Sequence, residues 1–294
     1  MEKTNTKKNT EEKTKKGTLY IVGTPIGNLG DITLRAIETL KKVDVILAED
    51  TRQTLKLLNH FEIEKHLVSY HRHNEDDKIK KMVEFLDNSK NLALVSDAGM
   101  PVISDPGSNL IKYLVENNYN VEVIPGVTAV ITAIVKSGID STRFSFEGFL
   151  SINKKQRKLR LKELQTEVRT MVFYEAPHKI LVTLKDMYEN FGNRNICIAR
   201  ELTKIHEQYI YTTFEKAIVK IEESGIKGEI VLIVEGADKQ KIQQEEQDAK
   251  IELDVIKLVK EEMENGTSKK DAVKLVAKLK GVNRNEVYQE CIDI

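Results

Sequence analysis

The sequence predicts an α/β protein in which strands and helices alternate. Short runs rich in valine, isoleucine and leucine are followed by segments whose apolar residues recur at helical spacing, a pattern typical of a mostly parallel sheet flanked by helices. The chain is 294 residues long, which is enough for two ordinary domains and an appendage. We therefore expect two sheet-containing units and a smaller C-terminal part.

The first unit is expected over residues 17–128. It follows a polar segment, 1–16, that is predicted to be a disordered tail because it has almost no apolar residues. Its strands are short apolar runs that end at glycine, proline or polar residues. They are predicted at Thr18–Val22, Val43–Ala48, Leu92–Val95 and Val121–Ile124. Helices are predicted at Asp31–Lys42, Asp77–Asn88, Asn109–Glu116 and Val127–Lys136.

The second α/β unit is expected over residues 129–237. Its strands are predicted at Phe144–Phe149, Arg169–Tyr174, Asn195–Ala199, Gln208–Thr213 and Glu229–Val234. Its helices are predicted at Lys154–Leu164, Pro177–Asn190 and Phe214–Glu223. The polar run 238–250 is typical of a linker. Residues 251–294 are expected to form three short helices separated by Gly266 and Gly281, and to resemble a helix-turn-helix module.

The composition excludes several classes of protein. Lysine and arginine number 46, as do aspartate and glutamate, so a basic surface for nucleic acid must be local. Cys197 and Cys291 are too few and too far apart for a disulfide framework or a cysteine metal site. His71 and His73 alternate along the backbone and make a poor metal pair, so no metal is expected. No apolar run is long enough to span a bilayer, and no signal peptide is recognisable, so we expect a cytoplasmic protein.

Glycine- and proline-containing or acidic loops follow four predicted strand ends. They cover residues 23–30, 49–52, 97–107 and 125–129. Open α/β sheets bind ligands at the carboxyl ends of their strands, and glycine lets a ligand approach the backbone closely. The glycine spacing fits neither a dinucleotide fingerprint nor a phosphate-binding P-loop. Because Asp97 and Asp105 make the third loop acidic, a ligand with an ammonium or sulfonium charge, such as S-adenosylmethionine, is favoured over a phosphate.

Eight segments together resemble a known superfamily. Residues Thr18–Thr33, Ala48–Arg52, Leu94–Pro101 and Ile124–Ala129 are similar to the tetrapyrrole methylases. Within that superfamily, Tyr70–Glu75, Phe144–Phe149, Phe173–His178 and Ala199–Thr203 resemble the ribosomal RNA small-subunit methyltransferase I family. The resemblance spans Gly17 to Gly236, in order and spacing, and extends to the helical tail.

The resemblance implies two α/β domains with S-adenosylmethionine bound in a cleft between them. It also implies 2′-O-methylation of a cytidine in 16S ribosomal RNA near the P site of the small ribosomal subunit, and a homodimer. Donor contacts carried over by position, largely through the backbone, are Pro25, Ile26, Asp97, Ala98, Gly99, Met100, Ile103, Thr128, Ala129, Tyr174, Glu229 and Ile230. Many superfamily members have Gly-Asp-Pro where this chain has Gly99-Met100-Pro101, so a side-chain role for an acid there is excluded.

Methyl transfer to a ribose hydroxyl requires alignment of the oxygen with the methyl group and is helped by a base. Candidates near predicted strand ends are Glu49, Asp50, Glu175 and Lys204, with His178 and Glu201. Glu49 and Asp50 have an alternative role, as the N-cap of a helix that follows them. Arg52 is expected either to pair with these acids or to bind an RNA phosphate.

The segment 154–162 carries six basic residues before its first acid. Such a run is usually a solvated helix face. In a chain of zero net charge, we favour phosphate binding instead, by Lys154, Lys155, Arg157, Lys158 and Arg160.

Two other functions stay open at this point. One is a small-molecule methylase of the same fold, acting on a tetrapyrrole or a modified histidine, although such an enzyme needs neither a basic helix nor a helical tail. The other is a non-catalytic RNA-binding protein with a degenerate donor pocket, which a measurement of donor binding would distinguish.

Overall fold

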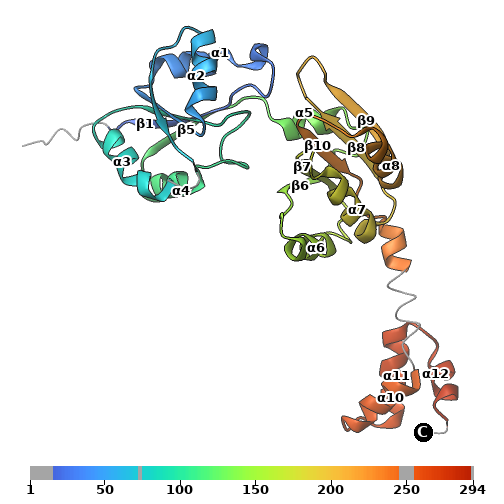
Figure 1. Ribbon diagram of the computed structural model, residues 1–294. Coiled ribbons are helices and arrows are strands. Elements are labelled where there is room, and N and C mark those ends of the chain that lie inside the picture. Colours follow the sequence, from blue (N-terminus) through green and yellow to red (C-terminus); the bar gives the residue numbers. More distant parts are fainter. Residues whose placement is uncertain (1–15, 72–74, 245–254, 293–294) are drawn as a thin grey trace, which may run out of the picture.

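The computed structural model describes residues 16–71, 75–244 and 255–292 (Figure 1). The first unit is built on a five-stranded sheet with the strand order β3-β2-β4-β1-β5. Its strands are β1 (Thr18–Val22), β2 (Val45–Ala48), β3 (His66–Ser69), β4 (Leu92–Val95) and β5 (Asn120–Ile124). All four strand pairs are parallel, so the loops that follow the strands meet at one edge of the sheet. The expected parallel α/β arrangement is confirmed.

Helices cover both faces of this sheet, and each face has its own apolar core. The helices are α1 (Leu34–Lys42), α2 (Thr51–His60), α3 (Glu75–Asp87) and α4 (Ser108–Glu116). α1 begins later than predicted because Thr33 accepts a hydrogen bond from the Ala36 N–H and caps the helix, after a short 3-10 turn at Leu29–Asp31.

The sequence predicts no element in residues 53–69 apart from the helix that Glu49 and Asp50 would cap, and the structure has α2 and β3 there. α2 buries only Thr54 and Leu58, so its apolar periodicity is weak. β3 is a four-residue edge strand whose only buried residue is Val68, which leaves no continuous apolar run to recognise.

The second unit has a mixed five-stranded sheet with the order β6-β7-β10-β8-β9. Its strands are β6 (Phe144–Phe149), β7 (Thr170–Glu175), β8 (Asn195–Arg200), β9 (Gln208–Thr213) and β10 (Ile230–Val234), each within one residue of the prediction. β6 and β7 are parallel, and the other pairs are antiparallel. The register brings Phe149, Glu175, Ile230 and Arg200 to one edge of this sheet.

The two faces of the second sheet are covered differently. α6 (Lys154–Glu163), α7 (Ile180–Phe191) and α8 (Phe214–Ser224) pack on the face that carries Phe173. The short helix α5 (Ala129–Val135) packs on the opposite face, against Val172, Val231 and neighbouring residues. Successive strand residues therefore serve two separate apolar cores, as the alternation of a β-strand requires.

The C-terminal helices α10 (Val255–Glu264), α11 (Lys269–Lys280) and α12 (Arg284–Glu290) pack around a core made of their own residues (Figure 1). Ser268 caps α11, and Gly281 ends it in the left-handed conformation. Residues 239–244 of the predicted linker are helical. Three predicted segments lie outside the described residues. They are residues 245–250 of the linker, residues 1–15 of the N-terminal tail, and residues 251–254 at the start of the first C-terminal helix. Within the described part of the chain, every helix is too short or too polar to cross a membrane.

Candidate functional site

Three loops of the first unit interlock at the carboxyl edge of its sheet. They follow β1, β4 and β5. Thr24 and Gly99 exchange two backbone hydrogen bonds, at 2.9 and 3.0 Å, which join the first loop to the second. The Gly23 N–H donates to the Ile124 carbonyl at 3.0 Å, which joins the first loop to the third. The loops that the sequence marks as ligand-binding thus form one continuous surface.

The glycines of these loops have two different roles. Gly23 and Gly126 lie backbone against backbone: a Cβ on Gly23 would come within 2.8 Å of Gly126, closer than real Cβ atoms approach. These two glycines are required for loop packing. Gly99 has a φ of +80°, in the left-handed region that favours glycine. Gly99 itself is buried, whereas the preceding residues Asp97 and Ala98 are exposed to solvent.

The donor contacts carried over to the loops after β1, β4 and β5 differ in their exposure. Pro25 and Ile26 are buried, whereas Met100, Thr128 and Ala129 are half-buried. Ile103 is 63% exposed on the second loop. Thr128 caps α5 by accepting a hydrogen bond from the Ile131 N–H at 3.3 Å.

The second-unit residues carried over as donor contacts all lie at one edge of the second sheet. Ile230 pairs with Glu175 and with Arg200, which puts the start of β10 beside the ends of β7 and β8. Both backbone groups of Glu229 are bonded to Glu201: its N–H donates to the Glu201 carboxylate, and its carbonyl accepts from the Glu201 N–H. The side chain of Glu229 stays exposed.

Tyr174 joins this edge to the loops of the first unit. Its hydroxyl lies near the backbone of Val130, at the start of α5. Burial raises the pKa of Tyr174, and the nearby charge of Asp105 on the 97–107 loop adds to the rise. Tyr174 therefore stays a neutral phenol with both units beside it.

The first loop also reaches into the second unit. Ile26 is buried in the apolar core that includes Leu202, Val231 and α5. The next residue, Gly27, packs against the side chain of Lys204, because a Cβ on Gly27 would lie 2.6 Å from Lys204 Cγ. The loop after β1, residues 23–30, is thus in direct contact with the loop between β8 and β9.

Asp50 caps α2, which is the alternative role expected for it. Its carboxylate accepts hydrogen bonds from the Arg52 N–H and guanidinium, and these bonds hold its pKa near 2. Arg52 pairs with Asp50 at 2.7 Å, which is the first of its two expected roles. The Asp50 N–H donates to Asp97 Oδ1 at 3.1 Å and so ties the β2 end to the 97–107 loop. A carboxylate with so low a pKa is a weak base at neutral pH.

Glu175 is buried and engaged in local structure. Its carboxylate accepts from the Ala176 N–H at 2.8 Å and from the Thr183 hydroxyl at 2.5 Å. These bonds connect the end of β7 to α7. His178, three residues later, is exposed in the turn that precedes α7.

Lys204 lies in a compact cluster with two carboxylates. Its ammonium contacts Glu229 at 2.8 Å and Glu201 at 3.1 Å. Burial lowers the pKa of Lys204, but the hydrogen bonds that its ammonium donates to Glu229 and Glu201 outweigh that effect, and the net pKa is raised. Lys204 is consequently a stable cation and a hydrogen-bond donor.

The backbone around Lys204 is strained. Glu201 and Thr203 have φ values of +50° and +64°, which non-glycine residues rarely adopt. Thr203 Oγ1 is buried without a hydrogen-bond partner. Strain and unsatisfied polar atoms of this kind concentrate at functional sites. Thr203 ends the segment Ala199–Thr203 that carries the resemblance, but the sequence alone assigns it no role of its own.

A family model described as Tetrapyrrole (Corrin/Porphyrin) Methylases matches residues 18–218. The chain belongs to this family.

Two curated relatives of this tetrapyrrole methylase family member match nearly its whole length. A protein of Halalkalibacterium halodurans is 45% identical over 283 residues, covering 96% of this chain and 97% of the relative. A protein of Bacillus subtilis is 45% identical over 272 residues, covering 92% and 93%. Both are named ribosomal RNA small subunit methyltransferase I.

Solved structures of other family members share the fold. Uroporphyrin-III-C-methyltransferase from Thermus thermophilus has a TM-score of 0.54 at 19% identity, covering 74% of this chain and 94% of that chain. The methyltransferase CobJ has a TM-score of 0.58 at 19% identity, covering 75% and 95%. The expected two-domain tetrapyrrole methylase fold is confirmed by these likenesses.

The basic segment of this family member forms α6, and its cations differ in their surroundings. Arg157 is buried, pairs with Asp186 at 2.7 Å, and donates to the Ser151 and Ile152 carbonyls. It anchors α6 to α7, so the structure places it in the core and not on an RNA-facing surface. Lys158 pairs with Glu189, and Arg160 pairs with Glu147 and Glu163.

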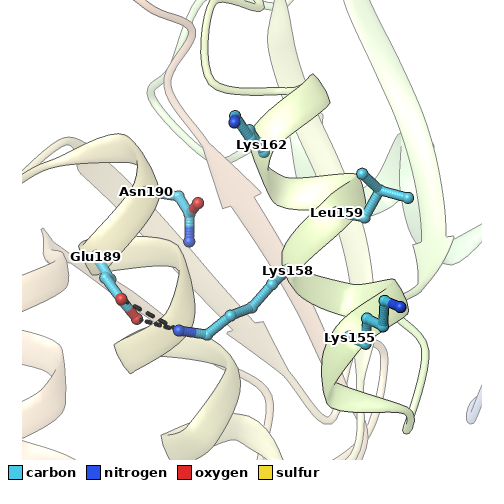
Figure 2. Close-up of a pocket in the computed structure, with 6 residues that line it drawn as sticks. All are labelled: Lys155, Lys158, Leu159, Lys162, Glu189 and Asn190. Atoms are coloured by element: carbon cyan, nitrogen blue, oxygen red, sulfur yellow. Dashed lines mark hydrogen bonds and ion pairs between the residues drawn. The ribbon is translucent and has the colours of Figure 1, made fainter.

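Lys154, Lys155 and Lys162 are exposed on α6. Lys155, Lys158 and Lys162 line a shallow hollow of about 380 Å³ between α6 and α7, together with Leu159, Glu189 and Asn190 (Figure 2). Figure 2 shows the Lys158 ammonium on Glu189, with Lys155 and Lys162 directed away from it. Arg160 is also exposed but is paired with two carboxylates, so Lys154, Lys155 and Lys162 are the cations of α6 considered further.

A metal centre finds no support in the described part of the chain, where no group of three or more histidine, cysteine, aspartate or glutamate side chains gathers. His71 is half-buried, and His73 lies outside the described residues.

Proposed function

We propose that this chain transfers the methyl group of S-adenosylmethionine to the ribose 2′-oxygen of a cytidine in small-subunit (16S) ribosomal RNA, near the P site. The observation that carries the proposal is the 45% identity, over almost the full length of both chains, with relatives named ribosomal RNA small subunit methyltransferase I. A match over 96% of the chain takes in most of the helical tail, whereas the solved structures of family members compared above cover 74–75% of the chain.

The donor assignment is supported by a structural neighbour and by the chemistry of the loops. Uroporphyrin-III C-methyltransferase of Thermus thermophilus is described in complex with S-adenosylhomocysteine. In this chain, the exposed Asp97 carboxylate lies two residues before the buried, left-handed Gly99 on an interlocked loop, which suits a positively charged ligand that contacts main chain. We assign donor binding to the segment 97–103, to Thr128 and Ala129, and to Tyr174.

The donor supplies an activated methyl group, and the protein supplies alignment and charge. We propose that Lys204 donates a hydrogen bond to the ribose oxygen and stabilises the negative charge that develops as the hydroxyl proton passes to solvent water, while the methyl group leaves the sulfonium as a neutral thioether forms. Glu201 and Glu229 hold the ammonium in place. The hydrogen bond from the Glu229 N–H holds the pKa of Glu201 below its usual range, so Glu201 acts as a fixed anion that positions Lys204.

For the RNA we propose contact with the exposed lysines of α6, Lys154, Lys155 and Lys162. Arg157, which the sequence alone assigns to phosphate binding, is not included because it is buried and pairs with Asp186.

The alternative of a small-molecule methylase has weaker support. The tetrapyrrole and diphthine enzymes that share the fold are only 13–19% identical to this chain and cover 74–75% of it in the examples compared. A likeness of that kind concerns the fold alone.

The deciding experiment is transfer of labelled methyl to small ribosomal subunits purified from cells that lack this enzyme. We expect label at one cytidine, and resistance of the adjoining phosphodiester to alkali, because a 2′-O-methyl group blocks the attacking hydroxyl. Naked RNA and uroporphyrinogen III serve as competing substrates. Label on a base, or transfer to uroporphyrinogen alone, contradicts the proposal, and absence of donor binding by calorimetry supports the non-catalytic alternative.

A further inference from the structure

Phe149 is a large aromatic side chain left in solvent at the end of β6. It is 60% exposed. Single exposed apolar residues are ordinary on protein surfaces, so exposure alone assigns no role. Three features of its surroundings set Phe149 apart.

The first feature is a β-bulge that determines where Phe149 points. The β6–β7 pairing slips between Phe146 and Gly148: Phe146 pairs with Val172, Gly148 with Phe173, and Phe149 with Tyr174. Strict alternation along β6 would put residues 146 and 149 on opposite faces. Because Glu147 is extra, Phe149 shares the face of Phe146 and Tyr174, the face on which α5 packs. Bulges are frequent beside active sites, where they redirect a side chain.

The second feature is an aromatic cluster that joins Phe149 to the proposed donor site. The ring centroids of Phe149 and Tyr174 lie 5.4 Å apart, and those of Phe146 and Tyr174 lie 4.9 Å apart. Tyr174 is also close to the charge of Asp105 on the first-unit loop. Next to Phe149, a Cβ built on Gly148 would lie 4.0 Å from Ser104 Oγ of the same loop.

The third feature is continuity with the basic helix. The bulged residue Glu147 pairs with Arg160 of α6 at 2.6 Å. α6 itself begins at Lys154, five residues after Phe149. Phe149 therefore lies beside the loop assigned to the methyl donor, at the end of the strand that leads into α6, although α6 itself packs on the opposite face of the sheet.

We propose that Phe149 is the stacking platform for the base of the nucleotide whose ribose is methylated. The inference rests on the proposed function and deepens it. Enzymes that act on a nucleotide often remove it from its stack, and single-stranded bases bind proteins by stacking on aromatic rings. With the base against Phe149, its sugar faces the edge that carries Tyr174, and the RNA strand continues past the end of β6 towards the lysines of α6.

The first test is steady-state methylation of small subunits by Phe149→Ala, Phe149→Leu and Phe149→Tyr. Loss of a stacking contact weakens binding about tenfold or more, so the alanine variant should show a KM for subunits raised by that factor. Phe149→Tyr should keep the KM for subunits close to that of the wild type. Phe149→Leu should raise it as alanine does, because leucine is apolar but has no π face. Donor affinity by calorimetry should be unchanged in all three variants.

The matched control is Tyr211→Ala. Tyr211 is 58% exposed and lies on β9, the opposite edge strand of the same sheet. It should leave the KM for subunits unchanged. Leucine as effective as tyrosine, or Phe149→Ala indistinguishable from wild type on an active enzyme, overturns the stacking role while leaving the proposed function intact. An inactive wild-type enzyme contradicts the proposed function instead.

A second measurement does not depend on turnover. The chain has no tryptophan, so Phe149→Trp introduces a single reporter. Stacking with a base should quench its fluorescence when a cytidine-containing single-stranded RNA oligonucleotide is added. An abasic oligonucleotide of equal length, which keeps the phosphates, should not quench it, and Tyr211→Trp should respond to neither. Equal quenching by both oligonucleotides, or none by either, contradicts the proposal.

Discussion

At the scale of single residues, Gly99 carries the most constrained role in the proposed donor site. It is in the left-handed region, and a Cβ would lie 3.3 Å from the Ile26 side chain. Gly99→Val should therefore displace the loop and weaken S-adenosylmethionine binding, by at least about tenfold, measured by calorimetry. Gly225→Val is the control, because Gly225 has a φ of +63° with nothing within 4 Å of its Cβ position. Equal donor affinity in both variants would remove the 97–107 loop from the site.

Lys204 gives the second residue-scale prediction. Lys204→Met should abolish most methyl transfer while donor affinity stays close to wild type, because the ammonium acts on the ribose oxygen. Its pKa is raised above the ordinary 10.5, so the charge is present throughout the neutral range and is lost only as pH rises beyond that value. The rate should accordingly show no ionisation of Lys204 between pH 7 and about 10. Lys185→Met, at a lysine that pairs with Glu222, should remain active; a similar loss there would argue against a specific role.

The sequence could predict only part of the residue-scale picture. Gly99, Asp97 and Tyr174 are recognisable because they belong to motifs. The burial of Arg157 could not be predicted, because its partner Asp186 is 29 residues away in sequence and a basic run is usually solvated. The left-handed conformations of Glu201 and Thr203 contradict the preferences of those residue types, so tertiary contacts alone reveal them.

At the scale of the element, α6 combines an anchoring face and a cationic face. Arg157→Ala leaves Asp186 buried without its partner and should lower the free energy of unfolding by about 3 kcal/mol, the usual cost of breaking a buried ion pair. Lys154→Ala should change it by less than about 0.5 kcal/mol, since that side chain is exposed. Chemical denaturation of the two variants measures the difference, and equal stabilities would contradict the anchoring role.

The cationic face is tested without disturbing the anchor. A triple variant, Lys154→Ala, Lys155→Ala and Lys162→Ala, should bind single-stranded RNA more weakly. If each lysine contacts a phosphate, the slope of log affinity against log salt should become shallower by about 2.

The control for this variant has the same change in net charge at Lys185, Lys216 and Lys220 on α7 and α8. It should keep the wild-type slope. Parallel slopes in all three proteins would assign α6 to the ordinary solvated surface and direct attention to the C-terminal module.

The strand boundaries could also be predicted only in part from the sequence. Strands buried on both faces, such as β1, β4 and β10, agree closely with the sequence prediction because their apolar runs are uninterrupted. The bulge in β6 could not be predicted: Glu147 and Gly148 indicate an irregularity, but only the pairing with β7 shows that Phe149 changes face. The β3 edge strand lacks the apolar run that would reveal it.

At the scale of the whole molecule, the resemblance predicts a homodimer. Ile131 and Val135, one turn apart on α5, are exposed and apolar, and so offer a surface for self-association. Light scattering should give twice the mass of the 33.5 kDa chain, and Ile131→Asp with Val135→Asp should reduce that mass. A monomeric wild-type protein contradicts the prediction, and a dimeric double variant places the interface elsewhere.

Ile26 belongs to the first unit by sequence and to the core of the second by packing. If the chain were cut between the units, the first fragment would expose the Ile26 side chain to solvent. The second fragment would have a cavity in its apolar core where Ile26 packs. Recombination that exchanges one half for that of a distant relative would meet the same difficulty, unless the cavity and the residue that fills it were exchanged together. Because of the short loop after β1, the two units are expected to evolve together, although each has a sheet of its own.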